Sequence, residues 1–120
     1  QHTCGKAEAL IEDFIDTGVA AWSSVQPTND IPEILTKYGN KICICGGYNT
    51  NGAPGRTDAT EEQIREEVRR CMNEYGKYRG FIFFGFLLAN SLDPKDKLTS
   101  LLPMIQEAES YRQNNRLDIF

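Results

Sequence analysis

KICICGGYNTNGAPGRTDATEEQIREEV, residues 41–68, holds one complete strand, loop and helix pattern, and this pattern decides the fold class. Within residues 41–46 isoleucine alternates with cysteine, and the run ends in a glycine pair, which predicts a short buried strand. Thr60 is followed three residues later by Gln63, the spacing of a capping box, and apolar residues then recur at helical spacing up to residue 75. The stretch therefore predicts a strand near 41–46 joined by a polar loop to a helix near 60–75.

The same order of strand and helix recurs on both sides of this stretch. The additional expected elements are helices near 6–17, 30–38 and 94–112 and strands near 20–25 and 80–85. Pro103 is expected to kink or divide the last helix, because proline cannot donate a helical hydrogen bond. Strands that alternate with helices in this way predict right-handed crossovers and a parallel sheet.

Two α/β architectures satisfy this alternation, a doubly wound sheet and a slice of a (β/α)8 barrel. The loops after the strands hold the polar and glycine-rich residues, and a barrel keeps its active site at that end of its strands. A complete barrel takes roughly 250 residues. We therefore expect residues 1–120 to form a single domain that corresponds to the C-terminal half of a TIM barrel.

Composition and charge exclude several function classes. The chain is 40% hydrophobic and carries a net charge of −4 without a basic stripe, which argues against binding to nucleic acid or to a membrane surface. Its longest apolar run, residues 81–89 with Gly85 inside it, is much shorter than the roughly 20 residues needed to cross a bilayer. No signal-peptide pattern opens the chain, so we expect a cytoplasmic protein with reduced cysteines.

The pattern also predicts which side chains are buried. Cys43 and Cys45 should lie on one face of their strand and Ile42 and Ile44 on the other, and Cys71 should lie in the core. The charged residues of the helix near 60–75 are expected to form a solvated surface with i,i+4 pairs: Glu61, Glu62, Arg65, Glu66, Glu67, Arg69 and Arg70. The residues expected on the buried side of the last helix are Leu98, Leu101, Leu102, Ile105 and Ala108.

The chain contains few candidate functional residues. His2 and Cys4 are one residue apart, so in an extended strand both side chains point to the same side, as a metal-ligand pair requires. The alternative is that both are ordinary residues of a chain end. Gln26, Tyr48 and Asn49 follow strands and are candidate substrate contacts; a packed tyrosine and solvated loop amides are the alternatives. No catalytic residue is assigned.

Four motifs carry a resemblance to a known family. They are His-x-Cys-Gly at 2–5, Gly-Val-Ala-Ala-Trp at 18–22 leading to Val-Gln-Pro at 25–27, Ile-Cys-Gly-Gly at 44–47, and the helix start at 60–68. In order and spacing the chain resembles the C-terminal half of the uroporphyrinogen decarboxylase (URO-D) superfamily, which includes cobalamin-dependent methyltransferases. The resemblance implies a TIM barrel, with His2 and Cys4 at the mouth of about the fifth strand.

In the methyltransferase branch, the resemblance implies that His2 and Cys4 bind zinc. A cysteine near the last barrel strand supplies a third ligand in that branch, whereas residues 81–90 of this chain contain none. Cys45, at the end of the preceding strand, is the candidate substitute. The implied reaction transfers a methyl group from a corrinoid to a thiol that zinc activates, with the corrinoid supplied by a partner protein.

Two other functions stay open. A decarboxylase acting on a porphyrinogen is the first alternative; that branch places a histidine near the last strand, whereas His2 is the single histidine here. The second is a non-enzymatic α/β module that pairs with another subunit. For an enzyme, we expect the N-terminal half of the barrel as a partner, and we expect the 120 residues alone to be inactive and to self-associate through uncovered strand edges.

Overall fold

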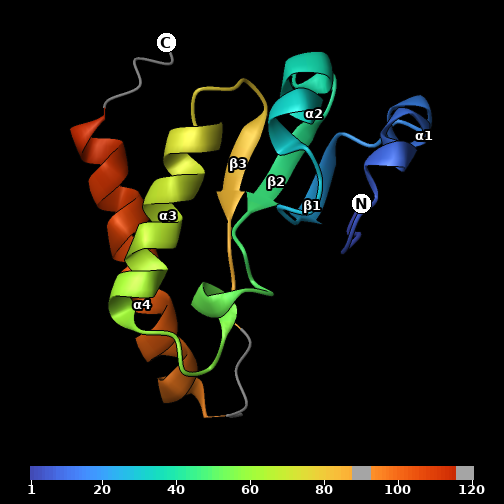
Figure 1. Cartoon of the computed structure of the whole chain (residues 1–120). Coiled ribbons are helices and arrows are strands. Elements are labelled where there is room, and N and C mark those ends of the chain that lie inside the picture. The colour runs from blue at the N-terminus through green and yellow to red at the C-terminus, as the bar shows by residue number, and fades with distance from the viewer. Residues whose placement is uncertain (88–92, 116–120) are drawn as a thin grey trace.

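The computed structural model describes residues 1–87 and 93–115, except for the side chains of residues 96–100. Its elements, drawn in Figure 1, are η1 (Glu8–Leu10), α1 (Ile11–Asp16), β1 (Ala21–Val25), α2 (Ile31–Tyr38), β2 (Cys43–Gly47), η2 (Ala53–Gly55), α3 (Glu61–Tyr75), β3 (Phe81–Phe84) and α4 (Pro94–Asn114). Each expected helix and strand is confirmed. The first helix differs in that it opens with the 3-10 turn η1.

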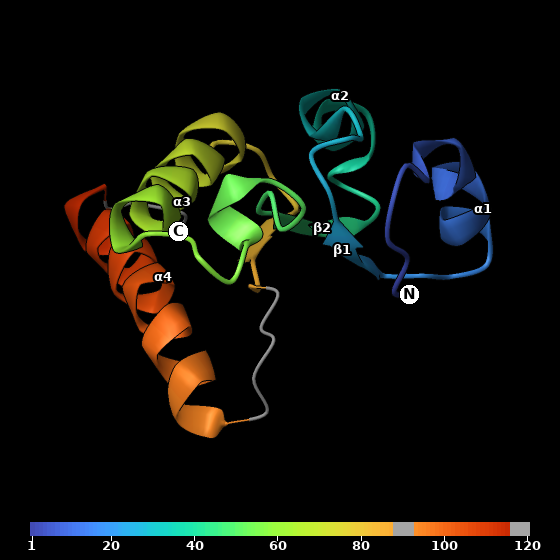
Figure 2. The same ribbon diagram turned by 60° about the horizontal axis from the view of Figure 1, so that its bottom comes forward.

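The described strands form one parallel sheet in the order β1-β2-β3. Strand order thus follows chain order, and Figure 2 shows α1, α2 and α3 on the same face of the sheet. A doubly wound sheet would carry helices on both faces, whereas a barrel carries them only outside. The arrangement is an α/β fold compatible with part of a TIM barrel.

Side-chain caps begin the helices where the sequence predicts them. The Thr60 hydroxyl accepts a hydrogen bond from the backbone N–H of Gln63, and the Gln63 side chain accepts one from the Thr60 N–H, which completes the capping box. The Asp30 carboxylate accepts the Glu33 N–H at the start of α2. In α4, Pro103 does not divide the helix, which continues to Asn114.

The core lies between the sheet and the helices. Trp22, Ile44 and Cys71 are fully buried there, which confirms the expected position of Cys71. Cys43 and Cys45 lie half-buried on the opposite face of β2, as the alternation predicts. On β3, that face leaves Ile82 48% and Phe84 43% exposed. One face of the sheet is therefore covered by helices, and the other is open.

The prediction for the last helix was partly wrong. Leu102 and Ile105 are exposed, and Met104 is buried in their place. The reason is that α4 packs along α3 instead of lying against the sheet, so a different stripe of the helix is covered (Figure 1). The side chain of Leu98 lies outside the described residues. Among the helices that the structure describes, none has both the length and the apolar content to span a membrane.

Candidate functional site

Residues 1–3 run parallel to β1, in the place that a further strand of the sheet would occupy. His2 forms a parallel bridge with Ser23, flanked by hydrogen bonds from Ser23 N–H to the Gln1 carbonyl (2.8 Å) and from Thr3 N–H to the Ser23 carbonyl (3.4 Å). Ser23 in turn pairs with Cys45. Paired residues of parallel strands point to the same face, so His2, Ser23 and Cys45 form a row across the open face.

His2, at the end of this row, also forms a pair with Cys4. The imidazole Nε2 of His2 lies 3.5 Å from Sγ of Cys4. The other ring nitrogen, Nδ1, lies 3.1 Å from the Ser23 hydroxyl oxygen, which is itself 3.4 Å from the Gln1 carbonyl oxygen. Donation from Nδ1–H to Ser23, followed by donation from the hydroxyl to Gln1, leaves the Nε2 lone pair facing Cys4.

The separation within the pair is that of a thiol–imidazole hydrogen bond, and two ligands of one zinc ion would lie equally far apart. A nitrogen and a sulfur ligand at about 2.0 and 2.3 Å from a tetrahedral zinc are themselves about 3.5 Å apart. This matches the separation between His2 Nε2 and Cys4 Sγ. The hydrogen bond on the remote nitrogen is also the usual support for a metal-binding histidine.

Cys45 is not grouped with this pair. It lies two strand spacings from His2, roughly 10 Å between backbones. In the part of the chain that the structure describes, no three histidine, cysteine, aspartate or glutamate side chains gather closely enough to hold a metal. Burial, and to a lesser degree the neighbouring Cys43, raises the pKa of the Cys45 thiol, which disfavours the thiolate. That Cys45 supplies a third metal ligand stays a prediction.

The predicted substrate contacts have partners within the protein. The Gln26 side-chain oxygen accepts the Gly5 N–H at 3.1 Å, so this residue adjoins the His2–Cys4 segment. Tyr48 is buried and donates its hydroxyl to the Pro54 carbonyl at 2.8 Å. Asn49 is half-buried and donates its backbone N–H to Glu67. Tyr48 and Asn49 are thus held by their own loop and by α3, and binding of substrate by these residues stays a prediction.

Comparison with known proteins identifies the family. The protein-family model for uroporphyrinogen decarboxylase (URO-D) matches residues 1–96, most of the chain. The chain belongs to the URO-D family. A search of curated proteins finds no match. The URO-D match includes β1, β2 and β3 as well as His2 and Cys4, so it confirms the resemblance carried by the motifs.

One strained residue of the URO-D chain was not predicted, and it follows Ser23, the residue that contacts His2. Ser24 has a left-handed backbone, with φ at 64°, and the strand register shifts between Ser23 and Val25. Its hydroxyl is buried without a partner among the described residues. Strained, unsatisfied residues of this kind concentrate at functional sites, and nothing in the local sequence indicates a bulge at a serine.

An ion pair between buried Glu67 and half-buried Arg70 of the URO-D chain was also missed. The prediction of a solvated surface is wrong for Glu67, which is buried and whose carboxylate accepts hydrogen bonds from Arg70 (2.6 Å) and from the Asn49 N–H (2.8 Å). Arg70 also donates to the Gly47 carbonyl at 2.9 Å. These bonds fix the C-terminal end of β2, where a barrel enzyme places its site.

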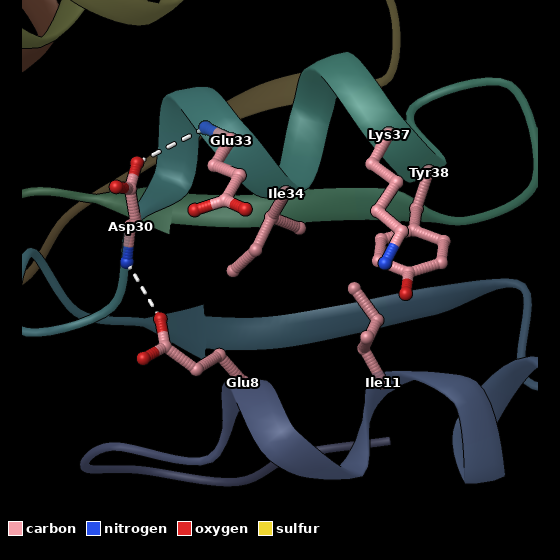
Figure 3. Close-up of a pocket in the computed structure, with 7 residues that line it drawn as sticks. All are labelled: Glu8, Ile11, Asp30, Glu33, Ile34, Lys37 and Tyr38. Atoms are coloured by element: carbon pink, nitrogen blue, oxygen red, sulfur yellow. Dashed lines mark hydrogen bonds between the residues drawn. The ribbon is translucent and has the colours of Figure 1, made fainter.

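A pocket of about 270 Å³ lies between α1 and α2, and Figure 3 shows its lining residues. Ile11 and Ile34 point into it from opposite helices, and the Glu8 carboxylate accepts the backbone N–H of Asp30 at 2.8 Å on one side. The pocket lies on the helix-covered side of the sheet, whereas His2 lies on the open side. It is therefore separate from the His2–Cys4 pair.

Proposed function

We propose that this chain supplies the C-terminal half of a (β/α)8 barrel in the URO-D superfamily and acts in corrinoid-dependent methyl transfer. Three features support the barrel: parallel strands in chain order, helices on one face, and His2 at the edge of β1 in the position of a preceding strand. The open face would then line the barrel interior. The N-terminal half of the barrel is the partner that this proposal requires.

The single observation that carries the proposed chemistry is the 3.5 Å separation between His2 Nε2 and Cys4 Sγ. A bound zinc ion would supply a Lewis acid that keeps the methyl-accepting thiol deprotonated. The chain's own residues would orient the site: the Ser23 hydroxyl would accept a hydrogen bond from Nδ1–H of His2, and Cys4 would offer its sulfur on the same side. Cys45 is the proposed third ligand, and a partner protein would supply the corrinoid.

Zinc titration of the chain at about pH 7.5 tests this proposal. We expect one weakly bound zinc ion per chain, lost in His2→Ala and in Cys4→Ser and weakened in Cys45→Ser. Cys43→Ser is the matched control, because Cys43 is also half-buried on the open face, and it should bind zinc like the parent. Binding that survives in the double variant of His2 and Cys4 would overturn the proposal.

A second candidate follows from the description of the matched family, decarboxylation of a porphyrinogen. This reaction does not require a metal bound to His2 and Cys4. It predicts that the chain, combined with the N-terminal half of the barrel, binds a polycarboxylate tetrapyrrole and that the double variant binds it equally well. Tetrapyrrole binding without specific zinc binding would favour decarboxylation. The absence of both would favour the non-enzymatic module.

A further inference from the structure

The segment that follows Cys4 is fastened to the loop after β1 by a buried amide. Asn29 is only 4% exposed, and its side chain makes four hydrogen bonds, all to backbone groups. Its oxygen accepts the N–H groups of Ala7 (2.9 Å) and Glu8 (3.1 Å). Its nitrogen donates to the carbonyls of Gly5 (2.9 Å) and Gln26 (3.0 Å). An asparagine amide offers two donors and two acceptor sites, so its capacity is filled.

Three further bonds fasten the same segment. The Gln26 side-chain oxygen accepts the Gly5 N–H at 3.1 Å, and the indole N–H of Trp22 donates to the Thr3 carbonyl at 2.9 Å. On the outer side, the Glu8 carboxylate accepts the Asp30 N–H, as Figure 3 shows. Backbone on both sides of Cys4 is therefore fixed to β1 or to the loop that follows it.

We propose that Asn29 and Gln26 are positioning residues that set the approach of Cys4 to His2. The inference rests on the proposed zinc site. His2 is fixed separately, by the backbone pairing with Ser23 on β1. Cys4, in contrast, lies beyond the paired residues, and its position depends on where Thr3 and Gly5 are held. Removing the amides would release the chain on the Gly5 side of Cys4 while leaving His2 and Thr3 in place.

This assignment gives Gln26 a role in orienting a ligand rather than in contacting substrate. The side chain of Asn29 makes four hydrogen bonds and that of Gln26 makes one, so Asn29 should hold the segment more firmly. Residues that orient metal ligands without touching the metal commonly change its affinity by about 10- to 100-fold. We expect a loss of about tenfold or more for Asn29→Ala and a smaller loss for Gln26→Ala.

The test measures zinc affinity of the 120-residue chain by chelator competition, with circular dichroism to establish folding. Gln26→Glu retains an acceptor oxygen for the Gly5 N–H and should restore the parent affinity, a rescue that lost stability alone does not predict. Thr60→Ala is the matched control: it removes a side-chain acceptor from a backbone N–H at α3 and should leave the affinity unchanged.

Each outcome decides the inference. Folded Asn29→Ala with the parent affinity overturns it while leaving the zinc site intact. If Asn29→Ala does not fold, Gln26→Ala decides: weaker binding that Gln26→Glu restores supports the inference, and parent-like binding overturns it. A parent chain that binds no zinc contradicts both the inference and the proposed function.

Discussion

The carboxylate of Glu67 accepts a 2.8 Å hydrogen bond from the backbone N–H of Asn49. This bond joins α3 to the loop that leaves β2, and Arg70 completes the link by donating to the Gly47 carbonyl. A buried carboxylate is stable only when its oxygens are paired, and Glu67 receives both a backbone and a guanidinium donor. The loop after β2 therefore leaves the sheet in one fixed direction.

We predict that Glu67→Ala lowers the free energy of unfolding by about 2–3 kcal/mol, because it leaves the Asn49 N–H without its acceptor. It also removes one of the two carboxylates that pair with Arg70, the other being that of Glu74. Urea unfolding followed by circular dichroism measures the change. Glu66→Ala is the control, since Glu66 is the exposed neighbour on the same helix, and it should change stability by less than about 0.5 kcal/mol. Equal effects of the two substitutions would show that the buried bonds contribute nothing.

Gly46 is predicted to be intolerant of any side chain. A Cβ atom at this position would collide with the backbone carbonyl and N–H of Val25 on the neighbouring strand. We expect Gly46→Ala to cost about 2 kcal/mol or more in the same unfolding measurement. A Cβ atom at Gly18 would meet no atom within 4 Å. Gly18→Ala should therefore lower the free energy of unfolding only by the strain of its left-handed backbone, about 1 kcal/mol. A Gly46→Ala variant no less stable than Gly18→Ala would contradict the close approach of β1 and β2.

These sites show which parts of the structure local sequence could predict. Thr60 with Gln63 and the alternation of isoleucine and cysteine near 41–46 act over a few residues, and both predictions are confirmed. The adjacency of His2 and Cys4 was also predictable, because two side chains one residue apart in a strand share a face.

Other features depend on partners distant in sequence. Asn29 stands next to Asp30, the cap of α2, yet its own partners include Gly5 and Ala7, more than 20 residues away. Glu67 reads as part of a solvated charge pattern, and its burial follows from the path of the loop after β2. No local pattern encodes these long-range contacts, so sequence reasoning missed them.

The bond between Glu8 and Asp30 predicts a dependence of stability on pH. The Asp30 N–H, and then Lys6, lowers the pKa of the Glu8 carboxyl below its usual 4.5. Its contribution is therefore complete above pH 4.5 and is lost as the pH falls below that value through the lowered pKa. We expect the stability difference between the parent and Glu8→Gln to shrink from about pH 6 to about pH 3. A difference that stays constant over this range would contradict the assignment.

Apolar side chains exposed on β3 and α4 lead us to predict self-association. Ile82 and Phe84 on β3 and Leu102 and Ile105 on α4 are each more than 40% exposed. We expect sedimentation velocity to show oligomers at concentrations on the order of 10 μM, and Phe84→Glu to reduce them. Leu10→Glu is the control, because Leu10 is 45% exposed on η1, which leads into α1 at the β1 edge of the sheet, away from β3. A parent chain that stays monomeric, or equal effects of both substitutions, would contradict the prediction.

The most direct test of the central claim is the X-ray absorption fine structure of the zinc-loaded chain. The proposed site predicts a nitrogen at about 2.0 Å and a sulfur at about 2.3 Å from the metal, from His2 and Cys4. The double variant His2→Ala/Cys4→Ser, with Cys43→Ser as control, should lose the bound zinc, while the control keeps the parent spectrum. A parent spectrum with only oxygen neighbours, or one that is unchanged in the double variant, would contradict the assignment of His2 and Cys4 as zinc ligands.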